Sequence, residues 1–453
     1  MPDAKVDAII IGAGPAGLSA AARLLQGGAE PLVLDNAPRT GGSLLSLREN
    51  GFLAEGGPNS LMLENDGAEA FLRSLGVVPL EALPAAKKRF LVCGGKPVAA
   101  PSGPLGAITT PLLSLRGKLR VLLEPFAAKA PAGDADESAG AFARRRLGAE
   151  VAARLVDPMV SGIYAGDVER LSLRSAFPRL REMELRYGSL LRAGLAKGRA
   201  APVRRLVNFA GGMAEITDAA ARFLGDGRLR LSANLRSVEH DAAAGVWRVE
   251  WASDGKVFRA AAPTLVFAAP PQSWAQMPLP AALAEMLAPW KTLEAPPLSV
   301  VSLGYERGQV AHPLDGFGLL APGGEKRKIL GALFQSSLFP GRAPEGCVLV
   351  TSFVGGCRAP ALGRLPAEEQ VALVRDELRE LLGAEGAPVF AKATHWPRAI
   401  PQYNVGYEAL RERLASAETH FAGLRFCGNY CAGVALPKTI LHAVKTAEKI
   451  LGA

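Results

Sequence analysis

The sequence predicts an α/β protein with a parallel-sheet domain built from separated segments, an α+β domain and a mainly helical insert. Three observations lead to this fold class. Strand–glycine–helix patterns stand near both ends of the chain, at 6–25 and 424–451. Short β-branched stretches separated by turn residues fill much of 246–354, which is typical of further strands. Residues 112–195 have a mainly helical pattern.

Composition sets limits on the class of protein. Hydrophobic residues make up 49% and charged residues 21% of the 453 residues, which excludes a disordered chain. The 52 Lys and Arg residues exceed the 43 Asp and Glu residues, giving a net charge of +9. This excess favours anionic partners, but no zinc-finger spacing or basic heptad pattern is present, so nucleic acid is not expected.

The cysteine pattern indicates a reducing, cytoplasmic setting. Five cysteines in a long chain are too few and too scattered for a disulfide framework. Cys427 and Cys431 have the wrong spacing for a CxxC site and are expected in the core. No histidine or cysteine cluster indicates a metal site.

The elements follow from their residues in chain order. Residues 6–11 and 32–34 are expected to be strands around a helix at 16–25, giving a βαβ unit. Hairpins are expected around Gly94-Gly95 and Asp254-Gly255. Strands are expected at 300–304, 316–320, 328–333, 348–354 and 424–427, and helices follow Pro366 and Pro437.

These elements divide the chain into three expected domains. Residues 1–83, 204–262 and 390–453 form a discontinuous Rossmann-like domain. Residues 84–100 and 263–389 form the α+β domain, and residues 101–203 form the helical insert.

The first turn carries a dinucleotide-binding motif. Gly12, Gly14 and Gly17 form G-x-G-x-x-G between a strand and a helix, where glycines allow a tight turn and close approach of a pyrophosphate. Asp35 follows the second strand, at the place of an acid that holds a ribose hydroxyl.

The loops that follow resemble the FAD-binding amine-oxidase superfamily. Its loops around the adenosine and the flavin edge match stretches 39–42 and 55–60, which place Arg39, Gly42, Gly57, Pro58 and Asn59 at the cofactor. The resemblance also assigns to FAD the C-terminal loop and helix start, where backbone N–H groups can stabilise reduced flavin. The residues concerned are Gly428, Val434, Ala435 and Leu436.

Several segments resemble one family, the protoporphyrinogen oxidases. They are 157–167, 316–322, 331–334, 339–344 and 396–403, and the likeness runs in order over nearly the whole chain. It implies FAD-dependent six-electron oxidation of protoporphyrinogen IX to protoporphyrin IX in heme biosynthesis, with oxygen as acceptor. A hydride is expected to leave a methylene bridge for the flavin in each step, so no side chain is assigned as catalytic base.

The resemblance also implies a substrate site. It assigns a propionate to Arg89 in a basic–Arg–aromatic stretch, because a guanidinium can bond a carboxylate bidentately. The macrocycle is expected against Gly166 and walls formed by Leu319, Leu320, Leu333 and Phe339. Val238 and Trp396 are further expected cofactor contacts.

The chain departs from these relatives at two places. Ser43 follows Gly41-Gly42 where a larger residue is common, and Lys438 stands where an acidic residue is common. The first changes the expected polarity at the flavin edge, and the second makes the helix start less favourable electrostatically.

Three alternatives stay open. Coproporphyrinogen III oxidation to coproporphyrin III differs only in the substrate's carboxylates. An amine oxidase usually has an aromatic cage, and near 427–430 only Tyr430 is evident in a chain with 6% aromatic residues. A flavin- or porphyrin-binding carrier would bind without turnover.

Membrane contact is expected to be peripheral, on the inner face of the cell membrane. Prolines interrupt the uncharged stretches at 97–115 and 260–284, so neither is expected to span a bilayer. An interfacial contact by the helical insert, with its leucines and basic residues, fits better. The next enzyme of the pathway and a second copy of the chain are further candidate partners.

Overall fold

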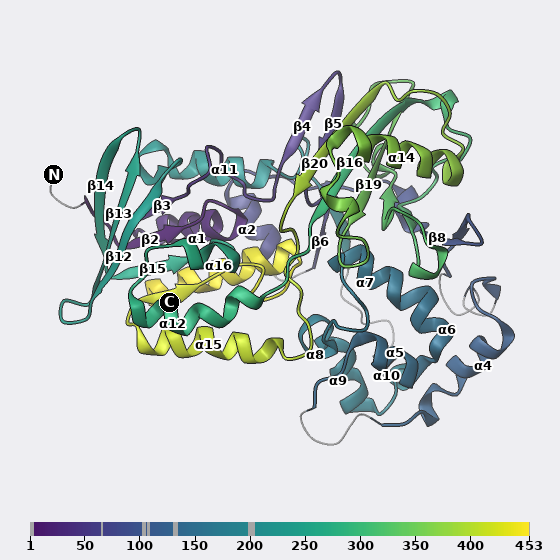
Figure 1. The fold of residues 1–453 in the computed structure, drawn as a ribbon, viewed down its shortest axis with the longest axis horizontal. Coiled ribbons are helices and arrows are strands. Elements are labelled where there is room, and N and C mark those ends of the chain that lie inside the picture. The colour runs from purple at the N-terminus through teal and green to yellow at the C-terminus, as the bar shows by residue number, and fades with distance from the viewer. Residues whose placement is uncertain are drawn as a thin grey trace.

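The computed structural model describes residues 4–64, 67–101, 106, 109–129, 135–197 and 204–452. Figure 1 shows two sheet-containing parts side by side, with a helical region below the right-hand one. The first strand and the last helix both lie in the left-hand part. The mixed α/β class is therefore as expected.

The left-hand part is built on a five-stranded sheet in which every pairing is parallel. Its central strands are buried over their whole length, as expected for parallel strands covered on both faces. In spatial order the strands are β11 (Leu229–Arg230), β3 (Pro31–Leu34), β2 (Ala8–Ile11), β15 (Thr264–Phe267) and β21 (Leu424–Phe426).

Helices cover one face of this sheet and a second sheet covers the other. Ala8, Ile10 and Val266 pack with α1 (Pro15–Gln26), α2 (Ala68–Ser74), α11 (Glu215–Leu224) and α16 (Leu436–Leu451). Ile9 and Trp247 share the core on the opposite face. The covering sheet has the order β1 (Ala4–Lys5), β14 (Lys256–Ala262), β13 (Val246–Ser253) and β12 (Asn234–Asp241).

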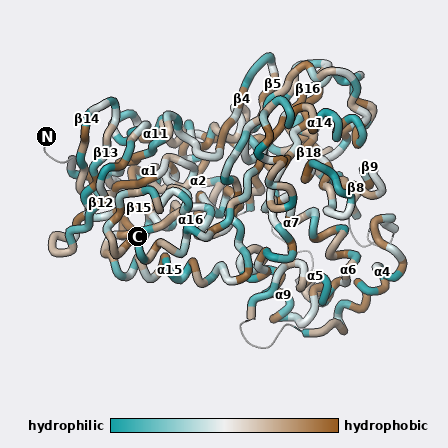
Figure 2. The backbone as a smooth tube through the Cα atoms, viewed as in Figure 1, coloured by the Kyte–Doolittle hydropathy of each residue, from teal (hydrophilic) through white to brown (hydrophobic). Residues whose placement is uncertain are grey.

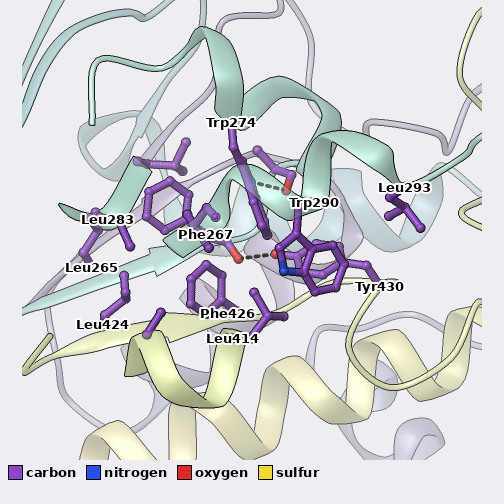
Figure 3. Close-up of a cluster of buried hydrophobic side chains, with 14 of the residues drawn as sticks. Leu265, Phe267, Trp274, Leu283, Trp290, Leu293, Leu414, Leu424, Phe426 and Tyr430 are labelled. Carbon is purple, nitrogen blue, oxygen red and sulfur yellow. Dashed lines mark hydrogen bonds between the residues drawn. The ribbon is translucent and has the colours of Figure 1, made fainter. Parts of the chain in front are cut away.

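An aromatic cluster packs against the ends of β15 and β21 (Figure 3). The rings of Trp274, Trp290 and Tyr430 lie with those of Phe267 and Phe426, with centroids 5.3 to 6.0 Å apart in the closest pairs. The Tyr430 hydroxyl donates to the carbonyl of Phe267 at 2.8 Å. The helices α12 (Ala281–Leu287) and α15 (Tyr407–His420) contribute Leu283 and Leu414 to the same core. The cluster thereby fixes the loop that follows β21.

The right-hand part contains a seven-stranded mixed sheet. One of its faces packs on α14 (Ala367–Leu382) through Val374 and Leu378. Its opposite face meets α7 (Asp157–Tyr164). The strand order is β20 (Phe390–Trp396), β16 (Leu298–Glu306), β19 (Cys347–Gly355), β18 (Gly331–Leu333), β17 (Gly318–Leu320), β8 (Phe90–Cys93) and β9 (Lys96–Ala99).

The helical region has ion pairs in its interior. Arg146 and Glu124 are fully buried and paired, and Glu124 also accepts hydrogen bonds from the backbone of Leu190 and Leu191. The helices are α4 (Leu115–Leu122), α5 (Ala139–Leu147), α6 (Ala149–Val151), α7, α8 (Leu173–Ala176), α9 (Pro178–Tyr187) and α10 (Leu190–Lys197). Hydrophobic and hydrophilic residues alternate along them (Figure 2). Among the described residues, no helix is long and apolar enough to cross a membrane.

Two small sheets connect these parts. One has the order β6 (Leu61–Leu63), β10 (Arg205–Asn208) and β7 (Leu80–Glu81). The other is the hairpin of β4 (Ser46–Glu49) and β5 (Phe52–Glu55). A short helix, α13 (Gln335–Leu338), follows β18.

Both expected hairpins are confirmed, but strand pairing differs from two expected domain boundaries. β15 lies within 263–389, yet it pairs with β2 and β21 in the parallel sheet. β20 lies within 390–453, yet it pairs with β16 of the seven-stranded sheet. Hydrogen bonding between strands that are distant in sequence decides to which sheet β15 and β20 belong. A local sequence pattern does not predict such pairing.

Candidate functional site

The glycine turn between β2 and α1 is tightly packed at two of its three positions. Gly12 has a φ of +115°, and a Cβ there would lie 2.7 Å from the backbone nitrogen of Ala269. A Cβ on Gly17 would overlap the carbonyl oxygen of Gly12. Gly14 differs, because its φ is −79° and the nearest atom to a Cβ would be Cα of Gly42, 4.0 Å away. The protein itself leaves space at Gly14.

The start of α1 fits a phosphate group. Gly14 is the N-cap and provides no side-chain hydrogen bond, Pro15 follows it, and the first turn has no acidic residue. The first N–H groups of the helix therefore lack intrahelical acceptors and favour an anion. A second glycine-rich loop lies beside this turn, because the Gly41 N–H donates to the carbonyl of Ala13 at 2.8 Å. Two touching loops with so few side chains suit the approach of a dinucleotide pyrophosphate.

Asp35 and Arg39 organise the same region. The Asp35 carboxylate accepts hydrogen bonds from the N–H groups of Ala13 at 2.6 Å and Ala37 at 2.8 Å. Each carboxylate oxygen has a second lone pair that could accept a ribose hydroxyl. The Arg39 guanidinium donates to the carbonyls of Gly42 at 2.6 Å and Leu44 at 3.1 Å. Arg39 therefore shapes the loop that Gly42 belongs to.

A buried polar network holds the Gly57–Asn59 loop. The Glu55 carboxylate accepts hydrogen bonds from Ser46 Oγ at 2.6 Å and from Asn208 Nδ2 at 3.1 Å. Asn208 Nδ2 also donates to the carbonyl of Asn59 at 2.8 Å. Gln335 of α13 donates to Asn59 Oδ1. Burial raises the pKa of the Glu55 carboxyl, against the lowering effect of these hydrogen bonds.

Gly57 and Trp396 lie together beside that network. A Cβ on Gly57 would overlap the carbonyl oxygen of Ser43, and Pro58 is partly buried. The Trp396 indole nitrogen donates to the carbonyl of Gly56 at 2.6 Å. The structure thus brings Ser43, which follows the predicted loop at 39–42, and the predicted loop at 55–60 together with Trp396.

The C-terminal loop resembles the first turn in its free helix start. α16 has Ala435 as N-cap, with no side-chain cap and no acidic residue in its first turn, which contains Leu436. Gly428 is buried and Val434 partly buried. Gly433 has a φ of +122°, and a Cβ there would lie 3.1 Å from Cδ of Lys438. The aliphatic part of Lys438 therefore lies over the loop.

Two further tyrosines lie beside this loop, which corrects the expectation that Tyr430 stands there alone. The rings of Tyr403 and Tyr407 stack with centroids 4.1 Å apart. The Tyr403 hydroxyl donates to the carbonyl of Asn429, and that of Tyr407 to the carbonyl of Tyr430. Both side chains are buried, so they form part of the core instead of an open cage.

Val238 lies farther out, on the edge strand β12. It is buried, and its N–H donates to the carbonyl of Pro278 at 2.9 Å. Its assignment to the cofactor stays a prediction.

The predicted substrate walls lie on different faces of the seven-stranded sheet. Leu320 pairs with Gly331 and Gly331 with Phe353, so these residues share one face, the one that meets α7. Leu333, two residues beyond Gly331, points to the same side and is partly exposed. Leu319 instead packs in the core under α14. We call the first set, Leu320, Gly331, Leu333 and Phe353, the α7 face.

Phe339 follows α13 and belongs to no strand of this sheet. It is fully buried, and the Arg342 guanidinium lies 5.6 Å from its ring centroid. Strand alternation turns Leu319 toward α14, and Phe339 is buried after α13. The assignment of both residues to the substrate walls stays a prediction.

Arg89 stands at the edge of this face. It is exposed and directly precedes β8, with its guanidinium 5.4 Å from the ring centroid of Phe317. Neighbouring Lys88 is paired with Asp315 at 2.6 Å. Arg89 itself has no acidic partner among the residues that the structure describes.

The glycines of the 157–167 segment make close contacts. A Cβ on Gly162 would lie 2.6 Å from Cδ2 of Leu320, and one on Gly166 would lie 2.5 Å from Oε1 of Gln402. Gly162 thus brings α7 against the α7 face. Gly166 is buried under Gln402, so its predicted contact with the substrate stays a prediction.

Sequence reasoning missed several residues that the fold brings to the site. Phe353 shares a face with Leu320 because of strand register, which no motif reports. Glu55, Asn208 and Gln335 come from three distant segments. The sequence offered one signal for this network, an acidic residue, Glu55, within a pattern typical of a buried β-strand.

Fold and site together define a flavin-dependent oxidoreductase: a parallel dinucleotide sheet, two uncapped helix starts, and a mixed sheet whose apolar face meets a helix. The model of the Flavin containing amine oxidoreductase family matches residues 15–451. A solved chain from Exiguobacterium sp. 255-15, provisionally named a protoporphyrinogen oxidase, has a TM-score of 0.82 at 21% identity, over 100% of this chain and 99% of that one.

Full-length relatives narrow the assignment. The mitochondrial protoporphyrinogen oxidase of Nicotiana tabacum is 32% identical over 98% of this chain and 94% of its own length. The coproporphyrinogen III oxidase of Propionibacterium freudenreichii is 30% identical over 100% of this chain and 92% of its own length. The chain therefore belongs to the Flavin containing amine oxidoreductase family, and FAD is its cofactor.

Proposed function

We propose that this protein oxidises protoporphyrinogen IX to protoporphyrin IX, with oxygen as the electron acceptor. Its full-length likeness to enzymes named protoporphyrinogen oxidase supports this proposal. So does the α7 face, whose partly exposed Leu320, Leu333 and Phe353 suit a flat apolar macrocycle.

The observation that carries the choice of substrate is the charge beside that face. Protoporphyrinogen has two propionates and coproporphyrinogen III has four. Two cations near this face already have acidic partners: Lys88 with Asp315, and Arg358 with Asp157. Arg89 has none in the described part of the chain. These pairings leave fewer cations free for carboxylates, which favours the substrate with two propionates.

The residues of this chain would hold the reactants and leave the redox chemistry to the cofactor. Bound FAD supplies the two-electron acceptor for each oxidation step and passes the electrons to oxygen. The start of α1 and Asp35 would hold its pyrophosphate and ribose. Leu320, Leu333 and Phe353 would exclude water from the macrocycle, and Arg89 would orient one propionate.

Comparing turnover of the two porphyrinogens tests this function. We expect kcat/KM for protoporphyrinogen IX to exceed that for coproporphyrinogen III by at least about tenfold, measured by porphyrin fluorescence with oxygen uptake. The reverse ratio would assign coproporphyrinogen III, as the relative from Propionibacterium freudenreichii suggests. Anaerobic loss of visible flavin absorbance on adding porphyrinogen separates an oxidase from a carrier, in which the absorbance would persist.

We also propose a peripheral contact of the helical region with the inner face of the cell membrane. Exposed apolar side chains lie on its surface together with the basic residues Arg116, Lys118 and Lys129. The apolar set is Leu115, Leu119, Leu122, Leu123, Phe126, Leu185, Leu191 and Leu195. Such a surface suits an anionic bilayer, where the next enzyme of the pathway or a second copy could also bind.

A further inference from the structure

Helix α7 is held at both of its ends by side chains from elsewhere in the chain. It belongs to the helical region, whereas the two side chains that bind its ends follow β19 and β20. Because α7 faces Leu320, its placement decides the space over the α7 face.

The clamp at the start of α7 is the guanidinium of Arg358. One terminal nitrogen donates to the carbonyl of Ala321 at 2.7 Å. The other donates to Asp157 Oδ2 at 3.1 Å and to Ser161 Oγ at 3.3 Å. Asp157 Oδ2 also accepts the Gly323 N–H at 2.7 Å. Arg358 therefore ties two residues of α7 to the strand end after β17.

The clamp at the other end is the amide of Gln402. Its Nε2 donates to the carbonyl of Tyr164, the last residue of α7, at 2.8 Å, and to the carbonyl of Ile400 at 2.9 Å. The side chain is 2% exposed. Its Oε1 is buried, has no hydrogen-bond partner among the described residues, and lies close to Gly166. Burying the Gln402 amide with its carbonyl oxygen unpaired costs free energy. The amide nevertheless keeps the position that binds the end of α7, which indicates that this contact is important.

Between these clamps α7 is pressed against the sheet. Gly162 lies too close to Leu320 to allow a Cβ without displacement, since the separation would be 2.6 Å. A guanidinium suits the first clamp because its planar donors reach three acceptors at once, which an ammonium cannot do in the same geometry. The clamps thus resist movement of α7 away from the sheet. Because Gly162 has no Cβ, the helix can lie this close to Leu320 without a clash.

We propose that Arg358 and Gln402 are positioning residues that set the distance between α7 and the α7 face, and with it how tightly the macrocycle is held. This inference rests on the proposed function. Neither side chain is assigned any contact with the reacting atoms. Their loss would weaken binding of substrate and transition state alike, which raises KM and leaves kcat nearly unchanged.

Kinetics of clamp variants test the proposal. In Arg358→Ala and in Gln402→Met we expect KM for the porphyrinogen to rise about tenfold, with kcat within about twofold of the unchanged protein. Arg358→Lys should recover part of the loss, because it keeps one charge beside Asp157 but not all three hydrogen bonds. Where Arg358→Ala fails to fold, Arg358→Lys and Asp157→Asn carry the test.

A matched control uses a nearby ion pair that does not touch α7. Arg170 and Glu294 are paired with half-exposed side chains, and Arg170→Ala should leave KM unchanged. Unaltered KM in Arg358→Ala and Gln402→Met would overturn the proposal. A fall in kcat as large as the rise in KM would also overturn the proposal, because it would show that Arg358 or Gln402 acts in the reaction step itself.

Hydrogen exchange separates failure of this inference from failure of the proposed function. Without substrate, the amides of residues 160–165 should exchange at least about tenfold faster in either clamp variant, while those of α14 stay protected. Unchanged exchange rates in α7 would refute the positioning role of Arg358 and Gln402, even if the protein is an active oxidase. An unchanged protein that oxidises neither porphyrinogen would refute the function and leave the exchange test of the clamps standing.

Discussion

Gly14 and Gly17 are both part of one motif, but they are glycines for different reasons. A Cβ on Gly17 would overlap the Gly12 carbonyl, so Gly17 is required by packing. A Cβ on Gly14 would lie 4.0 Å from its nearest neighbour, so the protein alone would accept alanine there. We therefore predict that glycine is needed at Gly14 for the cofactor and not for packing.

Alanine substitutions should separate these two roles. We expect Gly14→Ala to keep the melting temperature of the apoprotein while losing most bound FAD on gel filtration, because its methyl group would stand at the pyrophosphate. Gly17→Ala should lower the melting temperature of the apoprotein itself. Equal flavin retention in Gly14→Ala and the unchanged protein would contradict the assignment of this turn.

We propose Arg89 as a substrate-binding residue remote from the bond that reacts. We expect Arg89→Ala to raise KM for protoporphyrinogen about tenfold or more with little change in kcat, since a propionate contact is made equally in substrate and transition state. The KM of Arg89→Lys should lie between those of Arg89→Ala and the unchanged protein, because lysine keeps the charge but not the bidentate geometry. Lys88→Ala serves as the control, since Lys88 is already paired with Asp315. Unchanged kinetics in Arg89→Ala would remove it from the site.

At the scale of elements, the two faces of the seven-stranded sheet have different surroundings, and we propose different roles for them. Phe353 lies on the α7 face, whereas Leu319 lies under α14. We expect Phe353→Ala to lower kcat/KM at least about tenfold with a small change in stability. Leu319→Ala should cost about 2–4 kcal/mol of unfolding free energy and spare kcat/KM in the folded fraction. The reverse pattern, from kinetics and denaturant unfolding, would show that the faces are wrongly assigned.

Helix α16 contains a histidine that makes stability depend on pH. Burial lowers the pKa of His442 to about 4, with Lys449, Arg411 and Lys445 adding to the effect. Between the ordinary value of 6.5 and this folded value the unfolded chain binds the extra proton, so stability is lost as the pH falls through that window. The shift corresponds to a loss on the order of 3 kcal/mol at most.

Replacing His442 should remove that dependence. The melting temperature of His442→Leu should fall less than that of the unchanged protein between pH 7 and pH 4.5, measured by calorimetry. His420→Gln is the control, because His420 is exposed. If the melting temperature of His442→Leu still falls as steeply with falling pH, the acid sensitivity comes from other groups.

At the scale of the whole molecule, the helical region combines buried ion pairs with exposed leucines. Arg146 and Glu124 form its interior, while Leu115, Leu119 and Leu122 lie exposed on α4, at the outer edge of the region (Figure 1). We expect replacement of these three leucines by serine to reduce co-sedimentation with anionic vesicles at least about fivefold.

The control for this experiment is an exposed apolar residue on another part of the molecule. Val257→Ser, on β14, should leave the sedimented fraction unchanged. High salt should weaken binding of the unchanged protein, because the basic residues of the region contribute electrostatically. Equal sedimentation of all variants would contradict membrane contact through α4.

Local sequence pattern predicted much of the fold. The β2–turn–α1 unit, both hairpins and α14 follow from residues that are neighbours in the chain, because glycine and proline positions and apolar periodicity act within a few residues. The place of β20 and the facing of Leu319 did not follow. Both depend on pairing between strands that are far apart in sequence.

By itself, the sequence determined the glycine turn, its acid Asp35, and the place of Arg89 before a hairpin, because each depends on contiguous residues. Only the tertiary structure decided that Phe353 joins Leu320 on one face and that Arg358 and Gln402 reach the ends of α7. The physical reason is range. A turn is set by torsion angles within a few residues, whereas the contacts that hold α7 join segments more than a hundred residues apart.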